Sequence, residues 1–147
     1  MTPSEIRFEL LREHQELRLN ITQTRDAAAR ALTYPSAFKE LRDRTLLLCD
    51  RLRSHNSHEE ELLQDLLPTV DAWGAVRAKS MKAHHVEHEQ LSAALAGASD
   101  VLELAAYEEI VLSAMDRILD HMAHEEKMYL GENVLRDDNI VVDQSSG

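Results

Sequence analysis

The chain has 147 residues, a length that allows one domain with a hydrophobic core but is short for two. Only 4 glycines and 3 prolines interrupt a composition rich in leucine, alanine, glutamate and arginine, so helix is favoured throughout. The formal net charge is -11 and the basic residues are scattered, which argues against a nucleic-acid or anionic-membrane partner.

A single cysteine, Cys49, excludes a disulfide within the chain and favours a reducing compartment. The first residues carry no basic segment followed by an apolar run, and nowhere do 18 apolar residues stand together. We therefore expect a soluble, cytoplasmic protein without a membrane span, in which Cys49 is a packing residue.

The first helix is predicted from Thr2, Pro3 and Glu5, because threonine can cap, proline suits the first helical position and glutamate can complete a capping box. It should run to about Leu32. Its inward-facing positions alternate in steps of four and three, as in a bundle helix. They are Leu10, His14, Leu17, Ile21, Thr24, Ala28 and Ala31.

The second helix is predicted to follow Pro35, which breaks the first, with Ser36 as its cap and an end near Leu66. Its inward positions keep the same spacing without a slip. They are Leu41, Thr45, Leu48, Leu52, His55, Glu59, Leu62 and Leu66. Two ionisable side chains thus lie in an otherwise mostly apolar face.

The third helix is predicted from about Val70 to Ala96, with Gly97 well placed to end it. Counting back from the apolar pair Leu91 and Leu95 places His88 and His84 on the inner face. The same count leaves His85 and Glu89 outside that face.

The fourth helix is predicted to open with a capping box at Asp100 and Glu103 and to reach about Leu130, before Gly131. Its inward positions are Leu104, Tyr107, Val111, Ala114, Ile118, His121, Glu125 and Met128. Residues 132–147 read as a polar C-terminal tail, with a short apolar run, 140–142, that could dock.

The fold expected is therefore all-α, an antiparallel up-down-up-down four-helix bundle spanning residues 1–131. Seven polar groups occupy inward positions on the four helices, and residues four apart share one helix face, so each such pair can chelate an ion. The seven are His14, His55, Glu59, His84, His88, His121 and Glu125.

Burying two carboxylates and five imidazoles without compensation would cost several kcal/mol per charged group. Metal ions bound by these groups would remove that cost. Two alternatives stay open: His85 with Glu89 competes for the third helix, and Glu126 competes with Glu125. The extra histidines at 58, 85 and 124 are expected near the ligands or at the surface.

Imidazole and carboxylate ligands without thiolate exclude iron–sulfur clusters and leave iron, manganese or zinc. Seven ligands are too many for one tetrahedral zinc ion. They suit two six-coordinate ions bridged by Glu59 and Glu125, with a solvent-derived bridge and one open position.

These residues resemble the haemerythrin-like (HHE cation-binding) family, over most of the chain. The resemblance is carried by Arg12-Glu13-His14, by His55-xxx-Glu59-Glu60 followed by Leu66-Leu67-Pro68, by His84-xxx-His88 and by His121-xxx-Glu125-Glu126. It implies two iron ions with a bridging oxo or hydroxo group. His84, His88 and His121 would hold one ion, His14 and His55 the other, and Glu59 and Glu125 would bridge.

One departure bears on function. Oxygen carriers of the family place an aspartate five residues after the last histidine, whereas Glu125 follows His121 by four. The pattern is similar to the broader bacterial group, whose roles include oxygen or redox sensing, iron handling and peroxide or nitric-oxide chemistry.

The resemblance thus implies binding, storage or sensing of oxygen or a related diatomic or peroxide ligand. Alternatives are a peroxide-decomposing or oxidase enzyme and a structural metal bundle. With no output domain in the sequence, signalling would need a separate partner.

Overall fold

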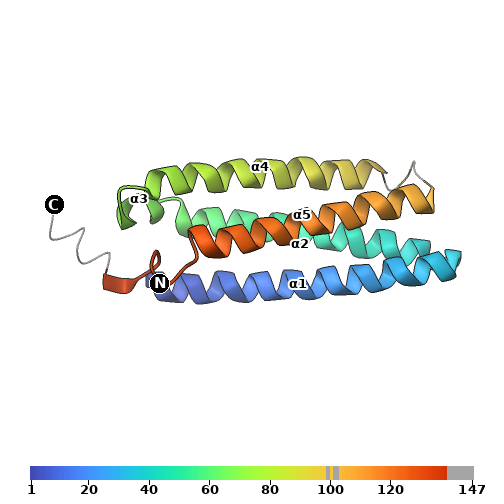
Figure 1. Cartoon of the computed structure of the whole chain (residues 1–147), viewed down its shortest axis with the longest axis horizontal. Coiled ribbons are helices and arrows are strands. Elements are labelled where there is room, and N and C mark those ends of the chain that lie inside the picture. Colours follow the sequence, from blue (N-terminus) through green and yellow to red (C-terminus); the bar gives the residue numbers. More distant parts are fainter. Residues whose placement is uncertain (99, 101–102, 139–147) are drawn as a thin grey trace.

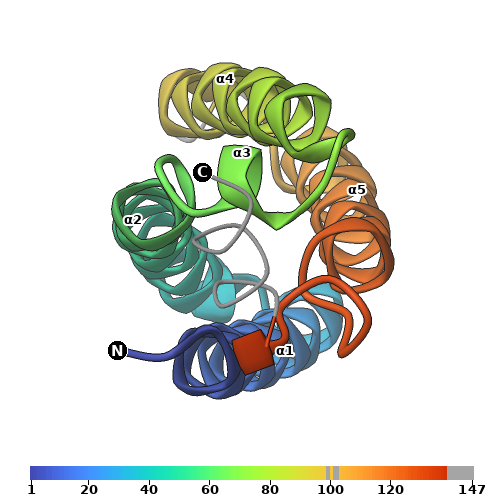
Figure 2. The ribbon, with the colours of Figure 1, turned by 90° about the vertical axis from the view of Figure 1, so that its left-hand side faces the viewer.

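The computed structural model describes residues 1–98, 100 and 103–138, and within these residues it is helical, without strands. The four long helices are α1 (Pro3–Thr33), α2 (Phe38–Leu63), α4 (Gly74–Ala98) and α5 (Leu104–Met128); η1 (Pro35–Ala37) and α3 (Leu67–Val70) are short. The start of α1 and the ends of α2 and α5 lie at the same end of the bundle (Figure 1). Seen along its length, the four long helices surround a common interior (Figure 2).

The start of α1 is the predicted capping box. The Glu5 amide donates to Thr2 Oγ1 over 3.2 Å, and the Thr2 amide donates to Glu5 Oε2 over 2.7 Å. All seven predicted inward residues of α1 are buried, so the register inferred from the sequence is confirmed for this helix.

The connection to α2 differs from the prediction, because Ser36 is not a cap. Pro35 opens a 3-10 turn whose backbone already has helical direction, and the amide of Ala37 donates to the Tyr34 carbonyl over 2.8 Å. The fixed φ of proline favours such a turn. As a result α2 begins at Phe38 without a side-chain cap.

The α2–α4 connection contains a break that the sequence reading missed. Helix α2 ends at Leu63 rather than near Leu66, and α3 forms before α4 starts at Gly74. A Cβ atom at Gly74 would lie 1.7 Å from the Leu67 carbonyl oxygen, so this close approach requires glycine. At the end of α2 the buried side is accordingly Leu63 rather than the predicted Leu62.

The α4–α5 connection also shifts. Gly97 lies inside α4, which ends at Ala98, and α5 begins at Leu104 after Glu103, which makes no side-chain cap bond. Residues 101–102 of the predicted capping box lie outside the described residues. Met128, predicted to face inward, is 40% exposed, and the buried position after Glu125 is Tyr129.

Two apolar clusters fill the interior, one on each side of a polar layer. One cluster, the larger, contains Leu17, Leu52 and Ile118, together with the predicted packing residue Cys49. The other cluster joins Ile6, Leu10, Leu63, Leu67, Ala78, Met81, Tyr129, Leu130, Val134 and Leu135. The polar layer between them is therefore enclosed along the axis of the bundle.

The segment after α5 folds back onto the start of α1. Val134 and Leu135 are each 2% exposed, and Asp137 accepts bonds of 2.9 Å from the amide and the hydroxyl of Ser4. The apolar run at 140–142 lies outside the described residues. In the part of the chain that the structure describes, no helix has the length and apolar character needed to cross a membrane.

Candidate metal centre

Two carboxylates lie in the middle of the polar layer: Glu59 from α2 is 0% exposed and Glu125 from α5 is 1% exposed. His14 Nε2 on α1 is 3.2 Å from Glu125 Oε2, and His55 Nε2 on α2 is 3.0 Å from Glu59 Oε2. One ligand atom from each of these four residues lies within 4.8 Å of the others. Three helices thus direct two imidazoles and two carboxylates to one point.

The outer nitrogens of both histidines are held by further carboxylates. His14 Nδ1–H donates to Glu126 Oε2 over 2.7 Å, and His55 Nδ1–H donates to Glu13 Oε1 over 2.7 Å. Arg18 in turn donates to Glu126 over 2.7 Å. These bonds aim each Nε2 at the centre, which is the arrangement that orients histidines bound to metal ions.

On α4 the structure corrects the expected helix face, since His85 rather than His84 points inward. His85 is 7% exposed; its Nε2 lies 3.1 Å from Glu59 Oε1 and its Nδ1 lies 2.8 Å from Glu60 Oε1. His84 is half-buried, with its ring stacked on His121 at 5.0 Å and its Nδ1 3.2 Å from the Tyr129 hydroxyl.

The reason for this rotation is Ser92. The buried side of α4 follows Met81, His85, His88, Ser92 and Leu95, whereas the sequence reading used Leu91 in place of Ser92. Ser92 is 3% exposed and lies beside the Cys49 thiol, while Leu91 is only partly buried. A buried polar side chain thus takes the place of the predicted apolar one.

His88 and His121 form the second part of the layer. His88, which is 2% exposed, has its Nε2 2.6 Å from His121 Nδ1. Its Nδ1 lies 3.1 Å from the Asn56 amide nitrogen, and turning this amide by 180° would let Asn56 Oδ1 accept the Nδ1–H. His121 is partly exposed, and Glu87 Oε2 lies 3.4 Å from its Nε2.

In the polar layer, protons on two histidines balance the negative charge of the buried carboxylates. Burial lowers the pKa of His14 and His55, but hydrogen bonds to carboxylates outweigh it and raise the pKa to about 11 and about 9. Burial raises the pKa of Glu59, yet the neighbouring His14, His55 and His85 hold it well below its usual value. Protonated imidazoles therefore occupy the place where cations would neutralise the carboxylates.

The rest of the layer carries less positive charge. Burial, with the neighbouring His121 and His85, lowers the pKa of His88 to about 3, so this imidazole is neutral. Burial and the charge of Glu59 raise the pKa of Glu125. A cation placed between these groups would lower the pKa of Glu125 and keep His88 neutral.

Two carboxylate oxygens without a hydrogen-bond partner are a further indication that these donor atoms fit a metal ion. Within the described residues, Glu59 Oε2 and Glu125 Oε1 are buried and have no hydrogen bond of good geometry, although His55 Nε2 is close to the former. Buried polar atoms are almost always satisfied by a partner. Two coordinating oxygens aimed at the same interior suit a cation, and nitrogen and oxygen donors suit iron, manganese or zinc.

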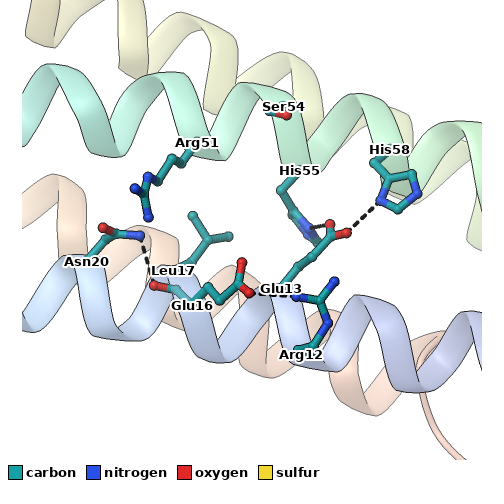
Figure 3. A pocket seen from close by; sticks show the side chains of 9 residues that line it. All are labelled: Arg12, Glu13, Glu16, Leu17, Asn20, Arg51, Ser54, His55 and His58. Atoms are coloured by element: carbon teal, nitrogen blue, oxygen red, sulfur yellow. Dashed lines mark hydrogen bonds and ion pairs between the residues drawn. The ribbon is translucent and has the colours of Figure 1, made fainter.

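The remaining sequence alternatives lie outside the centre. Glu89 is exposed and pairs with Arg53 over 3.2 Å, and Glu126 binds the outer side of His14. His124 is exposed, as expected. His58 is half-buried and donates to Glu13 over 2.6 Å, so Glu13 lies between His55 and His58 (Figure 3).

The carboxylates behind the histidines were not identified from the sequence. Glu13, Glu60 and Glu126 hold ring nitrogens, yet from the sequence they were recognised only as parts of the family motifs, and Glu126 also as a competing ligand. The available signal was their position, since each is the immediate neighbour of an inward residue. The buried Tyr129, four residues after Glu125, was also missed. It follows the end of α5, whereas the predicted inward position was Met128.

Comparison with known proteins adds a family. The sequence model of the hemerythrin HHE cation binding domain matches residues 6–132. This range includes every histidine and carboxylate of the candidate metal centre. No curated protein and no solved structure matches the chain.

Proposed function

We propose that this chain, which belongs to the haemerythrin HHE cation-binding family, holds two metal ions between its four long helices. One observation carries the proposal: His14, His55, Glu59 and Glu125 are buried and their ligand atoms lie within 4.8 Å of one another. An antiparallel, up-down-up-down order of the helices would put these residues at one level of the bundle.

We assign the two carboxylates as bridges. Glu59 offers one oxygen to His14 and His55 and the other to His85, so it lies between the two halves of the layer. His14 and His55 would hold one ion. The other would be held by His88 and His121, with a third histidine that is His84 in the sequence assignment and His85 in the alternative favoured by its contact with Glu59.

We further propose that the ions are iron and that the bound ligand is oxygen or a related small diatomic or peroxide. Iron would supply an oxidisable centre able to bind such a ligand. The chain excludes water around it with Leu17, Leu52 and Ile118, each at most 2% exposed. Glu13 and Glu126 hold the two histidine rings in orientation, so the ligand meets a preformed site.

A second function, turnover of peroxide, is supported by the position of His58. This histidine borders a hollow of about 310 Å³ that also reaches His55, and Glu13 bonds both rings. A relay formed by Glu13, His58 and solvent would move protons to and from the outer nitrogen of His55. Cytoplasmic location and a separate signalling partner stay predictions.

Metal analysis of protein produced with iron, together with its absorption spectrum, tests the metal proposal. Two ions per chain are expected, and Glu59→Ala and Glu125→Ala should each cut the content well below half, because a bridge contacts both ions. Glu89→Ala, at an exposed carboxylate on α4, is the matched control. Full occupancy in either bridge variant contradicts the bridging assignment.

Oxygen uptake separates the two functions. A binding protein takes up about one oxygen per pair of irons in the reduced state and releases it at least partly under vacuum. Rapid irreversible oxidation, with sustained oxygen evolution from hydrogen peroxide that disappears in His55→Ala, would favour the enzyme instead.

A further inference from the structure

A second group of metal-ligating side chains lies between α1 and α2, closer to the surface. Glu9, Glu13 and His58 each offer one ligand atom, and these atoms lie within 4.8 Å of one another. His58 Nδ1 is 2.6 Å from Glu13 Oε2, and His58 Nε2 is 3.7 Å from Glu9 Oε1. The side chains are between 16% and 32% exposed, so solvent reaches all three.

Two hollows give access to this group from different sides. Glu13 and His58 border the hollow that reaches His55, and Glu9 borders a second, open hollow beside Glu5 and Phe8. Arg12 lines both, but its guanidinium is bound to Glu16 over 2.6 Å, which reduces its repulsion of a cation. Hydrated ions can therefore reach the group without opening the bundle.

The group also touches the buried centre through one carboxylate. Glu13 Oε2 faces His58 while its Oε1 accepts from His55 Nδ1 over 2.7 Å, and His55 Nε2 faces Glu59. Glu13 and the His55 ring thus connect the surface group directly to the buried carboxylate Glu59.

We propose that Glu9, Glu13 and His58 form a third divalent-cation site, from which ions pass to the buried centre. Two carboxylates and one neutral imidazole offer two negative charges, and water would complete the coordination of a divalent ion. The ion is held more weakly than in the centre, because the site has three protein ligands and is open. The loading role, unlike the site itself, rests on the proposed function.

A Mn²⁺ titration tests the site independently of the centre. Protein first filled with two Zn²⁺ per chain and freed of excess zinc is titrated with Mn²⁺, and free Mn²⁺ is followed by electron paramagnetic resonance. We expect one further ion per chain, and at least about tenfold weaker binding in Glu9→Gln, which keeps the shape of the side chain. Glu61→Gln, at an exposed carboxylate on α2, is the matched control. Absence of Mn²⁺ binding, or equal binding in Glu9→Gln, overturns the proposal.

Uptake of Co²⁺ by metal-free protein, followed in stopped flow by the visible absorption of the bound ion, tests the route. Glu9→Gln and His58→Ala should slow loading of the buried centre several-fold, while the centre still fills with two ions per chain. Equal loading rates in the wild type and both variants overturn the loading role. If the wild-type centre takes up no ion at all, the proposed function fails instead, and the same Mn²⁺ titration of the metal-free protein and its Glu9→Gln variant decides the third site.

Discussion

The adjacent histidines His84 and His85 provide the sharpest test of the inner face of α4. The structure places His85 Nε2 3.1 Å from Glu59 Oε1, and His85 is 7% exposed, whereas His84 is half-buried and contacts Tyr129. We therefore expect His85→Ala to weaken metal binding much more than His84→Ala, which reverses the order expected from the sequence alone.

The size of the effect follows from what each ring contacts. Removing a group that merely supports a metal ligand costs about 10- to 100-fold in affinity, or about 1.4 to 2.8 kcal/mol, and loss of a direct ligand should cost at least as much. His85→Ala also removes one histidine partner from the Glu59 carboxylate. His84→Ala removes no contact to Glu59 and loses the stacking on His121 and the contact with the Tyr129 hydroxyl, so it should cost less than about tenfold, or about 1.4 kcal/mol.

Competition with a chromogenic chelator measures both variants on the same scale, and circular dichroism of the metal-free proteins verifies that each is folded. The comparison uses two histidines next to each other on one helix, so differences in expression or helix propensity largely cancel. Equal losses, or a larger loss in His84→Ala, would refute the inward assignment of His85 in the metal-bound protein.

Three further outcomes are expected. Chelation should lower the melting temperature by about 5 to 11 °C per ion. Each ion at one hundred times its Kd adds about 2.7 kcal/mol of stability, and 1 kcal/mol shifts Tm by roughly 2 to 4 °C. An unchanged Tm would show that these side chains are not buried around metal ions. The metal-free protein should lose stability as the pH rises from about 7 to 11, as measured by urea titration. His14 and His55 have raised pKa values of about 11 and about 9, so their stabilising protons are lost in this pH range. A stability that does not change with pH would contradict this charge balance. Deleting 132–147 removes two buried apolar side chains and should cost about 3 to 6 kcal/mol of unfolding free energy, whereas deleting 137–147 loses exposed bonds to Ser4 and should cost about 1 kcal/mol at most, as urea denaturation can show.

The sequence predicted α1 and most of α2 residue by residue, and the physical reason is redundancy. In α1 a complete capping box fixes the start, and an uninterrupted four-three spacing fixes the face, so local and tertiary preferences agree. In α2 the predicted inward residues from Leu41 to Glu59 are all buried. Such agreement also placed His14, His55 and Glu59 correctly in the interior.

The sequence failed on α4 because two faces of this helix are similar in polarity. Leu91 and Ser92 are adjacent, as are His84 and His85, so a rotation by one residue exchanges one plausible stripe for another. The choice depends on the Cys49 thiol that meets Ser92 and on Glu59 and Glu60 that meet His85, all of which belong to another helix. Periodicity within a helix cannot contain that information.

The carboxylates behind the histidines follow a rule that links neighbouring helices. Each long helix carries an inward residue next to a glutamate, and successive residues on a helix point about 100° apart, so the glutamate faces the adjacent helix. There it lies against the outer nitrogen of an inner-layer histidine. The pairs are Glu13 with His55, Glu60 with His85, Glu87 with His121 and Glu126 with His14.

These four pairs run from α1 to α2, from α2 to α4, from α4 to α5 and from α5 back to α1, and the same helix pairs are the ones in contact in the bundle. The four pairs form a closed cycle around the bundle only when His85, not His84, is the α4 histidine held by α2. This cycle supports the inward position of His85 in addition to its burial. The Glu87 link is the longest, at 3.4 Å, and its partner His121 is also the more exposed ring. Each carboxylate fixes the imidazole of the next helix and makes its inner nitrogen more basic, so the four helices position one another's inner histidines.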